Sequence, residues 1–584
     1  MTIPDSTAKS TPHRAGRGGA AQAWRRPSRL LLDLIKPERA DILIILTFSI
    51  MSGVLNLATP LAVDSVVNNI AFGGQELVYV QALLILAFAL FLFLALQAVL
   101  RGAQHYVMEI IQRRLFLRMT ADLAYRLPRV QAAVLEEASG PDLVNRFFEI
   151  VTVQKSSSLL LLQGINIVLS ALIGLVVLGF YHPFLLAFDM VLIASLVLVL
   201  YFMGQGAVSS SIRESYAKHA VATWLEQMAL FPVFFKGDGG AALAMERADL
   251  LGREYLHARR EHYRVLIRQI AGLLTLQAAA SAALLTIGGA LVLRGELTLG
   301  QLVASELIVG AIVSSVAKFD KQLESWYDVL AAADKLRHLT GLSIEREGGE
   351  LPRDSSGPAS LELREVAYGY DPDHVLFNDI SLHARPGARV AVVSAAGYGA
   401  SALLNLAYAT HNPGRGMVLL DGLDVRHWDL EALRRQVALV RGTEIVEGTI
   451  AQNVRLGREN LGMDAVQRAL EDVGLARDVL GFESGMDTQL KVGGRPLSRA
   501  QRTRLVLARA IIGCPRLLLV DEALEGLDIE TVSELESCLF DRSNPWTLVL
   551  VTRDPDLVAR CDDVIRLGEC HLSQGRVPPG SGPA

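Results

Sequence analysis

A segment at 394–402 has the residue types of a loop that binds phosphate. The short β-rich run 389–393 precedes it, and the apolar run 403–406 follows it. Glycines in such a loop let backbone N–H groups converge on a phosphate, and the dipole of the following helix adds positive potential. A strand-to-helix turn also needs glycine for steric reasons alone, so both interpretations stay open. Ala400 stands where such a loop carries the lysine for the outer phosphates, and no other segment supplies G-x-x-x-x-G-K-[ST].

Two acids at the end of an apolar run are candidates for binding the metal ion and the water molecule that act on a nucleotide phosphate. Asp521 and Glu522 directly follow 517–520, a run typical of a buried strand. Acids in this place hold Mg²⁺ and polarise a water molecule in nucleotide hydrolases. Two acids at a strand end are also often only solvated. Together with the glycine-bearing loop, they favour a nucleotide-binding domain.

The elements that must position these residues follow an α/β pattern from residue 361 onward. Strand-like runs lie at 361–366, 389–393 and 516–520, and helix-like runs lie at 430–436, 463–473 and 498–513. Because 342–360 is rich in Gly, Ser and Pro, we predict a linker there. We therefore predict an α/β domain at 361–572 and a disordered tail at 573–584.

The composition is that of a membrane protein. The 584 residues are 51% apolar and 20% charged, and the mean hydropathy is +0.33. This excludes a disordered chain, collagen and a disulfide-stapled secreted fold. Six apolar runs approach the ~20 residues that cross a bilayer: 41–63, 78–100, 158–181, 183–206, 270–293 and 298–317. Asp189 and Glu306 lie in the fourth and sixth runs; such acids are functional candidates, or they face a wet cavity or reach the membrane surface.

Lysine and arginine residues are distributed unevenly between the loops. The stretches 101–157 and 207–269 hold eight and nine of them, whereas the loops on the opposite side hold only Arg294. By the positive-inside rule, both termini and both long loops face the cytosol. We predict a multi-pass protein of a bacterial inner (plasma) membrane, with a transmembrane domain over 30–341. The basic tail 1–29 is expected to be disordered and held by charge to membrane lipid, or to act in targeting.

Charge and cysteine content give no support for a nucleic-acid-binding protein or for a disulfide-bonded fold. The net charge of −5 gives no reason to expect a nucleic-acid partner. All four cysteines lie between 514 and 570, within the α/β part of the chain. This distribution favours a reduced cytosolic domain over a disulfide framework.

In motif order and spacing, the chain resembles a half-transporter of the ABC exporter family, which has six membrane spans followed by one ATP-binding domain. The resemblance covers residues 30–572. The matching segments are 366–370 (aromatic loop), 394–402 (Walker A), 440–454 (Q-loop), 497–502 (LSGGQ signature), 521–528 (Walker B and D-loop), 550–554 (switch-histidine segment), and 139–146 and 295–302 in the membrane half. The resemblance implies an α-helical membrane domain of six transmembrane helices, joined to an α/β P-loop ATP-binding domain.

The resemblance also implies a role for each matching residue. Tyr370 would stack on adenine, Glu522 would stand at the general-base position, and Arg553 would stand at the position of the switch histidine. The residues implied to contact the nucleotide are Tyr370, Ser394, Gly397, Gly399, Ala400, Ser401, Arg441, Ser498, Arg499, Gln501 and Asp528, and those implied to hold Mg²⁺ are Ser401 and Asp521.

The departures from the family pattern are concentrated at the positions that contact the nucleotide in the family. They are Ala400 for the Walker A lysine, Ser394 for its first glycine, Arg441 for the Q-loop glutamine, Arg499 and Ala500 for the signature glycines, and Arg553 for the histidine. A charge-assisted contact from lysine to phosphate is worth roughly 1.5–3 kcal/mol, so losing it together with the histidine should almost silence the site. We expect Arg441 and Arg553 to be solvated or paired with nearby acids; the alternative is that they return positive charge near the γ-phosphate.

These departures predict a subunit of an ABC-type exporter whose own binding of ATP and Mg²⁺ is weak or absent. Hydrolysis would need an intact second half-transporter, so a heterodimer is favoured over a homodimer, and the segment 295–302 slightly favours a peptide or protein substrate. The alternatives are an active homodimeric exporter with atypical motifs and a regulatory membrane subunit that transports nothing. The tips of the inner loops, 140–155 and 226–240, are expected to dock on the ATP-binding domains.

Overall fold

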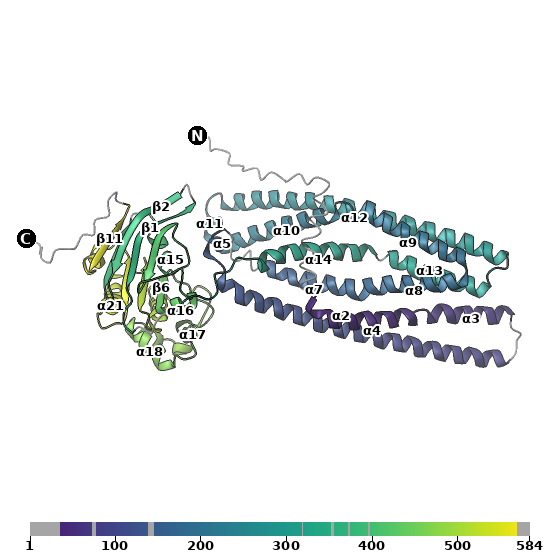
Figure 1. The fold of residues 1–584 in the computed structure, drawn as a ribbon, viewed down its shortest axis with the longest axis horizontal. Helices are drawn as coiled ribbons and strands as arrows, with labels where there is room; N and C mark the ends of the chain where they lie inside the picture. Colours follow the sequence, from purple (N-terminus) through teal and green to yellow (C-terminus); the bar gives the residue numbers. More distant parts are fainter. Residues whose placement is uncertain are drawn as a thin grey trace, which may run out of the picture. The chain divides into compact units, whose positions relative to one another are not determined.

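The computed structural model describes residues 36–72, 77–137, 145–317, 319–351, 356–371, 374–394 and 398–568. These residues form two compact units, a helical unit and an α/β unit (Figure 1). The helical unit comprises the residues up to 130 and those from 134 to 343; the α/β unit comprises 131–133 and the residues from 344 onward. The tails 1–29 and 573–584 and the Walker A residue Gly397 lie outside the described residues.

Long helices build the helical unit. The α-helices are α2 (Arg39–Leu55), α3 (Ala58–Phe72), α4 (Leu77–Arg126), α5 (Ala132–Glu137), α7 (Glu149–Leu159), α8 (Ile165–Tyr181), α9 (Pro183–Met203), α10 (Ala207–Leu230), α11 (Pro232–Lys236), α12 (Gly240–Leu293), α13 (Leu299–Ala317) and α14 (Phe319–Thr340). Short turns are the 3₁₀-helices η1 (Lys36–Glu38), η2 (Leu127–Arg129) and η3 (Arg146–Phe148), and the π-helix η4 (Leu160–Gly164). With 50 and 54 residues, α4 and α12 continue well beyond the ~20 residues of a membrane span.

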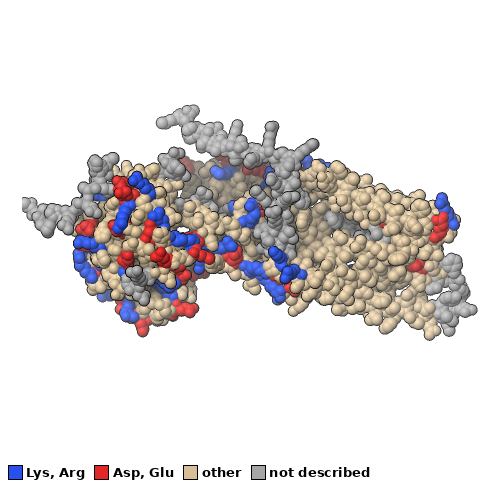
Figure 2. All heavy atoms as spheres, viewed as in Figure 1, with Lys and Arg blue, Asp and Glu red and all other residues tan. Residues whose placement is uncertain are grey.

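Several of these helices are apolar enough to lie in a membrane. Five described stretches are long and apolar enough to cross one: Lys36–Asn68, Gln81–Arg129, Arg146–Tyr181, Pro183–Met203 and Gly240–Leu293; the apolar stretch Leu299–Gly310 is shorter. Large apolar side chains on these helices are exposed, for example Phe88, Phe180 and Leu285. Figure 2 shows the surface of the helical unit as largely uncharged over its middle, with charged residues towards its ends. Such a surface is suited to hydrocarbon and not to water, so this unit is a membrane domain.

The first predicted span, 41–63, is not one continuous helix. Helix α2 ends at Leu55, and α3 begins at Ala58. Because proline has no N–H, Pro60 cannot donate to the carbonyl of Asn56, four residues earlier. The helical hydrogen-bond ladder is therefore interrupted there, and two helices share the predicted span.

Buried polar contacts hold α7, α10 and α14 together. Glu149 Oε1 accepts a hydrogen bond from Lys335 Nζ at 2.8 Å and lies 2.7 Å from His219 Nε2, which joins α7, α14 and α10. The side chain of Lys335 is only 2% exposed. Asn145 Nδ2 donates to Glu226 Oε2 at 2.9 Å, so the two predicted loop tips contact each other.

The two acids in the predicted spans have different surroundings. Asp189 on α9 is buried, and neither of its carboxylate oxygens has a hydrogen-bond partner among the described residues. Glu306 on α13 is exposed. Of the two, only Asp189 is enclosed by its own chain.

Three sheets form the α/β unit. A four-stranded antiparallel sheet has the order β2 (His374–Ala384), β1 (Leu361–Asp371), β4 (Arg415–Leu420), β5 (Leu423–Asp424), and a five-stranded parallel sheet has the order β11 (Asp563–Leu567), β3 (Arg389–Ser394), β10 (Thr547–Val551), β9 (Leu517–Asp521), β6 (Val437–Arg441). A third pair is β7 (Gly448–Thr449) with β8 (Gln489–Leu490). Strands β9 and β10 are buried at every position, as their runs of Leu and Val require.

Helices flank these sheets and complete the core. They are α15 (Ala400–Ala407), α16 (Leu430–Gln436), α17 (Ile450–Arg455), α18 (Met463–Asp472), α19 (Ala476–Leu480), the 3₁₀-helix η5 (Gly485–Asp487), α20 (Arg499–Ile511), α21 (Ile529–Phe540) and α22 (Pro555–Ala559). Helix α15 packs its Leu403, Leu404 and Leu406 into one apolar core, whereas α18, α20 and α21 contribute to a second. The parallel sheet lies between the two cores, because alternate residues of β9 belong to each.

Candidate functional site

The parallel sheet brings the predicted chemical residues to one edge. Because parallel strands end on the same side of a sheet, the last residues of β3, β10, β9 and β6 lie in a row, in this order. Arg441 is paired in register with Asp521, which is itself paired with Val551 at the end of β10. The segment after β3 leads directly into α15. Residues far apart in the sequence are therefore neighbours in space, such as Val392 of β3 and Val551 of β10, which are paired in register.

The described residues on either side of the predicted phosphate loop are the end of a strand and the start of a helix, as expected. Ser394 ends β3, and Gly399 caps the N-terminus of α15 with a φ of +82°. A Cβ atom at Gly399 would come within 3.0–3.1 Å of Phe377 and Leu376, so glycine is required for both reasons. Ala400, at the position of the lysine, is 6% exposed and belongs to the apolar core. The loop therefore retains a helix N-terminus, but at position 400 it carries a buried methyl group in place of an ammonium.

The Q-loop arginine is held by three hydrogen bonds beside this loop. Arg441 Nε donates to Asp521 Oδ2 at 2.5 Å, Nη1 donates to Asn405 Oδ1 at 2.9 Å, and Nη2 donates to the carbonyl oxygen of Ser401 at 3.1 Å. Asp521 has a side chain that is 4% exposed. Its other oxygen, Oδ1, accepts from Ser401 Oγ at 3.0 Å. Both carboxylate oxygens of Asp521 therefore have donors from this chain.

The second acid is also paired with an arginine. Arg553 Nη2 lies 3.6 Å from Glu522 Oε1, and both side chains are about half exposed. Glu522 has a φ of +48°, which is uncommon for a residue with a side chain and occurs more often at functional sites. Our expectation that Arg441 and Arg553 are paired with nearby acids is thus confirmed, and the acids are the two of Walker B.

The signature residues form the start of α20. Ser498 Oγ accepts a hydrogen bond from the backbone N–H of Gln501, and Gln501 Oε1 accepts one from the backbone N–H of Ser498. This reciprocal capping box orders the helix N-terminus. Arg499 Nη2 donates to the carbonyl oxygen of Glu525 at 3.0 Å, and its guanidinium lies beside Gly526. The arginine that replaces a signature glycine therefore contacts the D-loop of its own chain.

Asp528, the last predicted D-loop residue, caps α21. Its carboxylate accepts hydrogen bonds from the backbone N–H of Thr531 at 2.9 Å and from Thr531 Oγ1 at 2.8 Å. These bonds to the backbone and side chain of Thr531 hold the pKa of Asp528 below its usual value. The carboxylate is therefore charged at neutral pH.

The predicted adenine platform is exposed on β1. The ring of Tyr370 is edge-on to the ring of Tyr368, at 5.7 Å between centroids, and to that of His411, at 6.5 Å. An exposed aromatic face that other rings support is suited to stacking on a base. The sequence analysis did not identify His411 or the Arg441 partner Asn405. A polar Asn405 within the apolar run of α15 was the one signal that pointed to a buried contact.

A magnesium ion does not fit the residues at the predicted metal position. Mg²⁺ takes oxygen ligands and is usually bound by one or two carboxylates, together with phosphate and water. Here Asp521 already neutralises a guanidinium, and Ser401 donates its hydroxyl proton towards Asp521. Bringing a divalent cation to Asp521 would place two positive groups at one carboxylate. The predicted metal ligands Ser401 and Asp521 are thus together, but an arginine lies among them.

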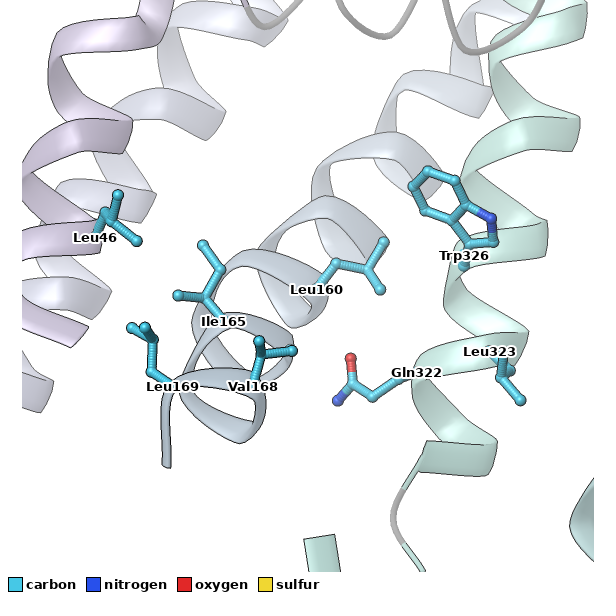
Figure 3. A pocket seen from close by; sticks show the side chains of 9 residues that line it. Leu46, Leu160, Ile165, Val168, Leu169, Gln322, Leu323 and Trp326 are labelled. Carbon is cyan, nitrogen blue, oxygen red and sulfur yellow. The ribbon is translucent and has the colours of Figure 1, made fainter. Parts of the chain in front are cut away.

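The helical unit contains a separate apolar cavity of about 510 Å³. Figure 3 shows the residues that line it: Leu46 from α2, Leu160 from η4, Ile165, Val168 and Leu169 from α8, and Gln322, Leu323 and Trp326 from α14. The amide of Gln322 extends from α14 towards α8 in this view. Its Nε2 donates to Gln163 Oε1 at 3.1 Å, and its Oε1 has no hydrogen-bond partner among the described residues. This lining suits an apolar group that carries one hydrogen-bond donor.

Comparisons with known proteins agree with both units. Residues 42–226 match the family model described as ABC transporter transmembrane region, and residues 377–525 match the one described as ABC transporter. The β-(1→2)glucan export ATP-binding/permease protein NdvA of Rhizobium meliloti (strain 1021) is 28% identical over 50% of each chain, so the chain spans about half the length of this relative. The ABC multidrug transporter mdr2 of Aspergillus fumigatus is 25% identical over 94% of this chain and 70% of its own.

A solved structure, that of a bacterial Atm1-family ABC exporter with ATP bound, has the same fold as the chain. The TM-score is 0.80 at 20% sequence identity, over 91% of this chain and 94% of that one. The two family matches and this fold similarity confirm the predicted fold class. The chain therefore consists of an ABC transporter membrane domain of the exporter type, followed by an ABC transporter P-loop domain.

Proposed function

We propose that the chain is a subunit of an ABC-type exporter that needs an intact partner half-transporter for ATP hydrolysis. The observation that carries this proposal is the pairing of both Walker B acids with arginines of the same chain, Asp521 with Arg441 and Glu522 with Arg553. A general base that is neutralised by a neighbouring cation is a weaker base. The buried Ala400 supplies no charge to the phosphates.

The partner is proposed from the geometry of paired ABC domains. In the family, each ATP lies between the Walker A loop of one domain and the signature of the other. Two copies of this chain would pair two lysine-less loops with two arginine-bearing signatures. An intact partner would instead supply its own loop, base and histidine, and this chain would supply Ser498 and the D-loop to Asp528. We therefore favour a heterodimer in the membrane, with one working site.

The substrate proposal is less specific. The relatives carry names for the export of a glucan and of many drugs, which differ in chemistry. The segment 295–302 keeps a slight preference for a peptide or protein substrate. The apolar cavity beside Gln322 is a candidate place for an apolar side chain of such a substrate.

The proposal is tested by the ATPase rate of the purified chain alone. We expect a rate at background that Glu522→Gln leaves unchanged, because Glu522 activates no water in this chain. Purification from native membranes, followed by mass spectrometry, should recover a second half-transporter with an intact Walker A lysine. Fast turnover by the isolated chain that Glu522→Gln abolishes would refute the proposal.

A further inference from the structure

Three oxygen atoms surround the guanidinium group of Arg441, as oxygen ligands would surround a bound cation. Three of the five N–H groups of a guanidinium are used, one for each of the oxygens from Asp521, Asn405 and Ser401. The side chain of Arg441 is 38% exposed, whereas that of its partner Asp521 is 4% exposed. The guanidinium is thus held by three acceptors, and two of its N–H groups have no partner among the residues that the structure describes.

The fold places this cation where a phosphate would arrive. Arg441 is the last residue of β6, and its Nη2 bonds the backbone of Ser401, in the first turn of α15. An anion at the N-terminus of α15 would therefore lie next to the guanidinium. Guanidinium groups bind phosphate oxygens through paired N–H donors, and they stay charged at any physiological pH.

We propose that Arg441 is a resident cation that replaces Mg²⁺, so that this chain binds ATP without a metal ion. It neutralises Asp521, it lies beside Asp521 and Ser401 and bonds a carboxylate oxygen of one and the carbonyl oxygen of the other, and it presents its remaining donors to the phosphates. Both carboxylate oxygens of Asp521 already accept hydrogen bonds, so a divalent cation would have to displace the guanidinium or share an oxygen atom with it. The inference rests on the proposed function only in that this domain is taken to bind ATP.

The other replaced positions agree with this assignment. Arg553 and Glu522 form a second neutral pair at the same edge. Together with the pair of Asp521 and Arg441, the negative charges of two acids are balanced by the positive charges of two arginines, without a metal ion. A site that needed Mg²⁺ would instead keep its acids unpaired for the ion. The paired acids therefore favour a permanent, metal-free charge balance.

The experiment measures the Kd of ATP for the purified full-length chain, by calorimetry or by competition with a fluorescent ATP analogue, in Mg²⁺ and in EDTA. We expect the two Kd values of the wild-type chain to agree within about threefold, since Arg441 is the counter-ion in both solutions. In Arg441→Gln, the family's residue type returns and Asp521 becomes free, so Mg²⁺ should tighten ATP binding by about tenfold or more.

Control variants assign the effect to Arg441. Arg435→Gln removes an exposed arginine of helix α16 that, among the described residues, bonds only Glu431, and this variant should behave as the wild type. Arg441→Met is a second uncharged variant, and Arg441→Lys keeps the charge and should stay independent of Mg²⁺. The thermal unfolding midpoint of each variant confirms that the chain is folded.

Each outcome decides the inference. Equal Kd values for the wild type, together with a Mg²⁺ requirement or a complete loss of ATP binding in folded Arg441→Gln or Arg441→Met, support it. A wild-type Kd that Mg²⁺ lowers tenfold overturns it, as does an Arg441→Gln that binds like the wild type in both solutions. No ATP binding by the wild type also overturns it, while a background ATPase rate would leave the proposed function standing.

Discussion

At the scale of single residues, the replaced motif positions act on one short segment. Arg441 bonds Asp521, Arg553 pairs with Glu522, and Arg499 donates to the carbonyl of Glu525. Arg441 ends β6, Arg499 begins α20 and Arg553 lies after β10, yet all three contact residues within 521–525. Because groups in one network influence each other, the effects of changing them should not add.

This coupling predicts how catalysis returns when family residues are restored. Ala400→Lys alone should raise the ATPase rate of the isolated chain less than about threefold, because Arg441 still holds Asp521 and Arg553 still neutralises Glu522. The combination of Ala400→Lys, Arg441→Gln, Arg499→Gly and Arg553→His should raise it by about 100-fold or more, since the electrostatic terms return together. Phosphate release at saturating MgATP measures both rates.

A further substitution checks where the restored activity arises. Adding Glu522→Gln to the four changes should return the rate to background if the activity belongs to this site. A large rise from Ala400→Lys alone would contradict the coupling, because it would mean that the arginine pairs do not hinder catalysis.

At the scale of elements, the buried ion cluster connects three helices of the membrane domain. Glu149 of α7 lies against Lys335 of α14 and His219 of α10. Removal of one member leaves a buried charge with too few partners, whereas removal of a buried pair as a unit is often nearly neutral. The cluster therefore predicts that a second substitution recovers stability that a first one has lost.

We predict that Lys335→Met destabilises the membrane domain by about 3 kcal/mol, because Glu149 loses its ammonium donor. The double variant Lys335→Met, Glu149→Met should recover most of that loss, to within about 1 kcal/mol of the wild type. Thermal unfolding of the full chain in one detergent compares the three proteins. A double variant that is less stable than Lys335→Met would show that the contacts of Glu149 matter more than its charge.

Elements could be predicted well where the pattern is local. The apolar run 517–520 predicted a buried strand, and the segment from 389 to 406 predicted a strand followed by a helix; the structure has the buried strand, and it has β3 before and α15 after the glycine-bearing loop. The interruption at Asn56–Leu57 was missed, since a single proline within an apolar run gives a weak signal. Local periodicity does not report on a hydrogen bond that is lost at one carbonyl.

The pairings at the site could be predicted only in part. The sequence predicted that Arg441 would be solvated or paired with an acid, but strand order decides which acid, and the neighbours β6 and β9 are separated by more than seventy residues. The buried pair of Lys335 with Glu149 joins residues 186 positions apart, and nothing in either segment indicates the other. Contacts of this kind depend on tertiary packing and not on local propensity.

At the scale of the whole molecule, the distribution of Lys and Arg predicts the orientation in the membrane. The loop between α12 and α13 carries Arg294 and should face outward, whereas the turn between α11 and α12 carries Asp238 and should face the cytosol. Both residues are exposed, so a cysteine at either place is accessible to a reagent on its side. The four native cysteines are first replaced by serine.

In intact cells, a maleimide that cannot cross membranes should label Arg294→Cys and leave Asp238→Cys unmodified. After the cells are opened, both variants should be labelled to a similar extent, which shows that both thiols are reactive. Labelling of Asp238→Cys in intact cells would show that the predicted orientation is wrong, because this turn would then face outward and not the cytosol.

The unbroken lengths of α4 and α12 have a mechanical consequence. A helix of 54 residues rises about 80 Å. If it swings as a rigid lever by about 5°, its far end travels about 7 Å, more than the rise of a whole helical turn. A small rotation at one end of the helix would thus become a displacement as wide as a small molecule at its other end.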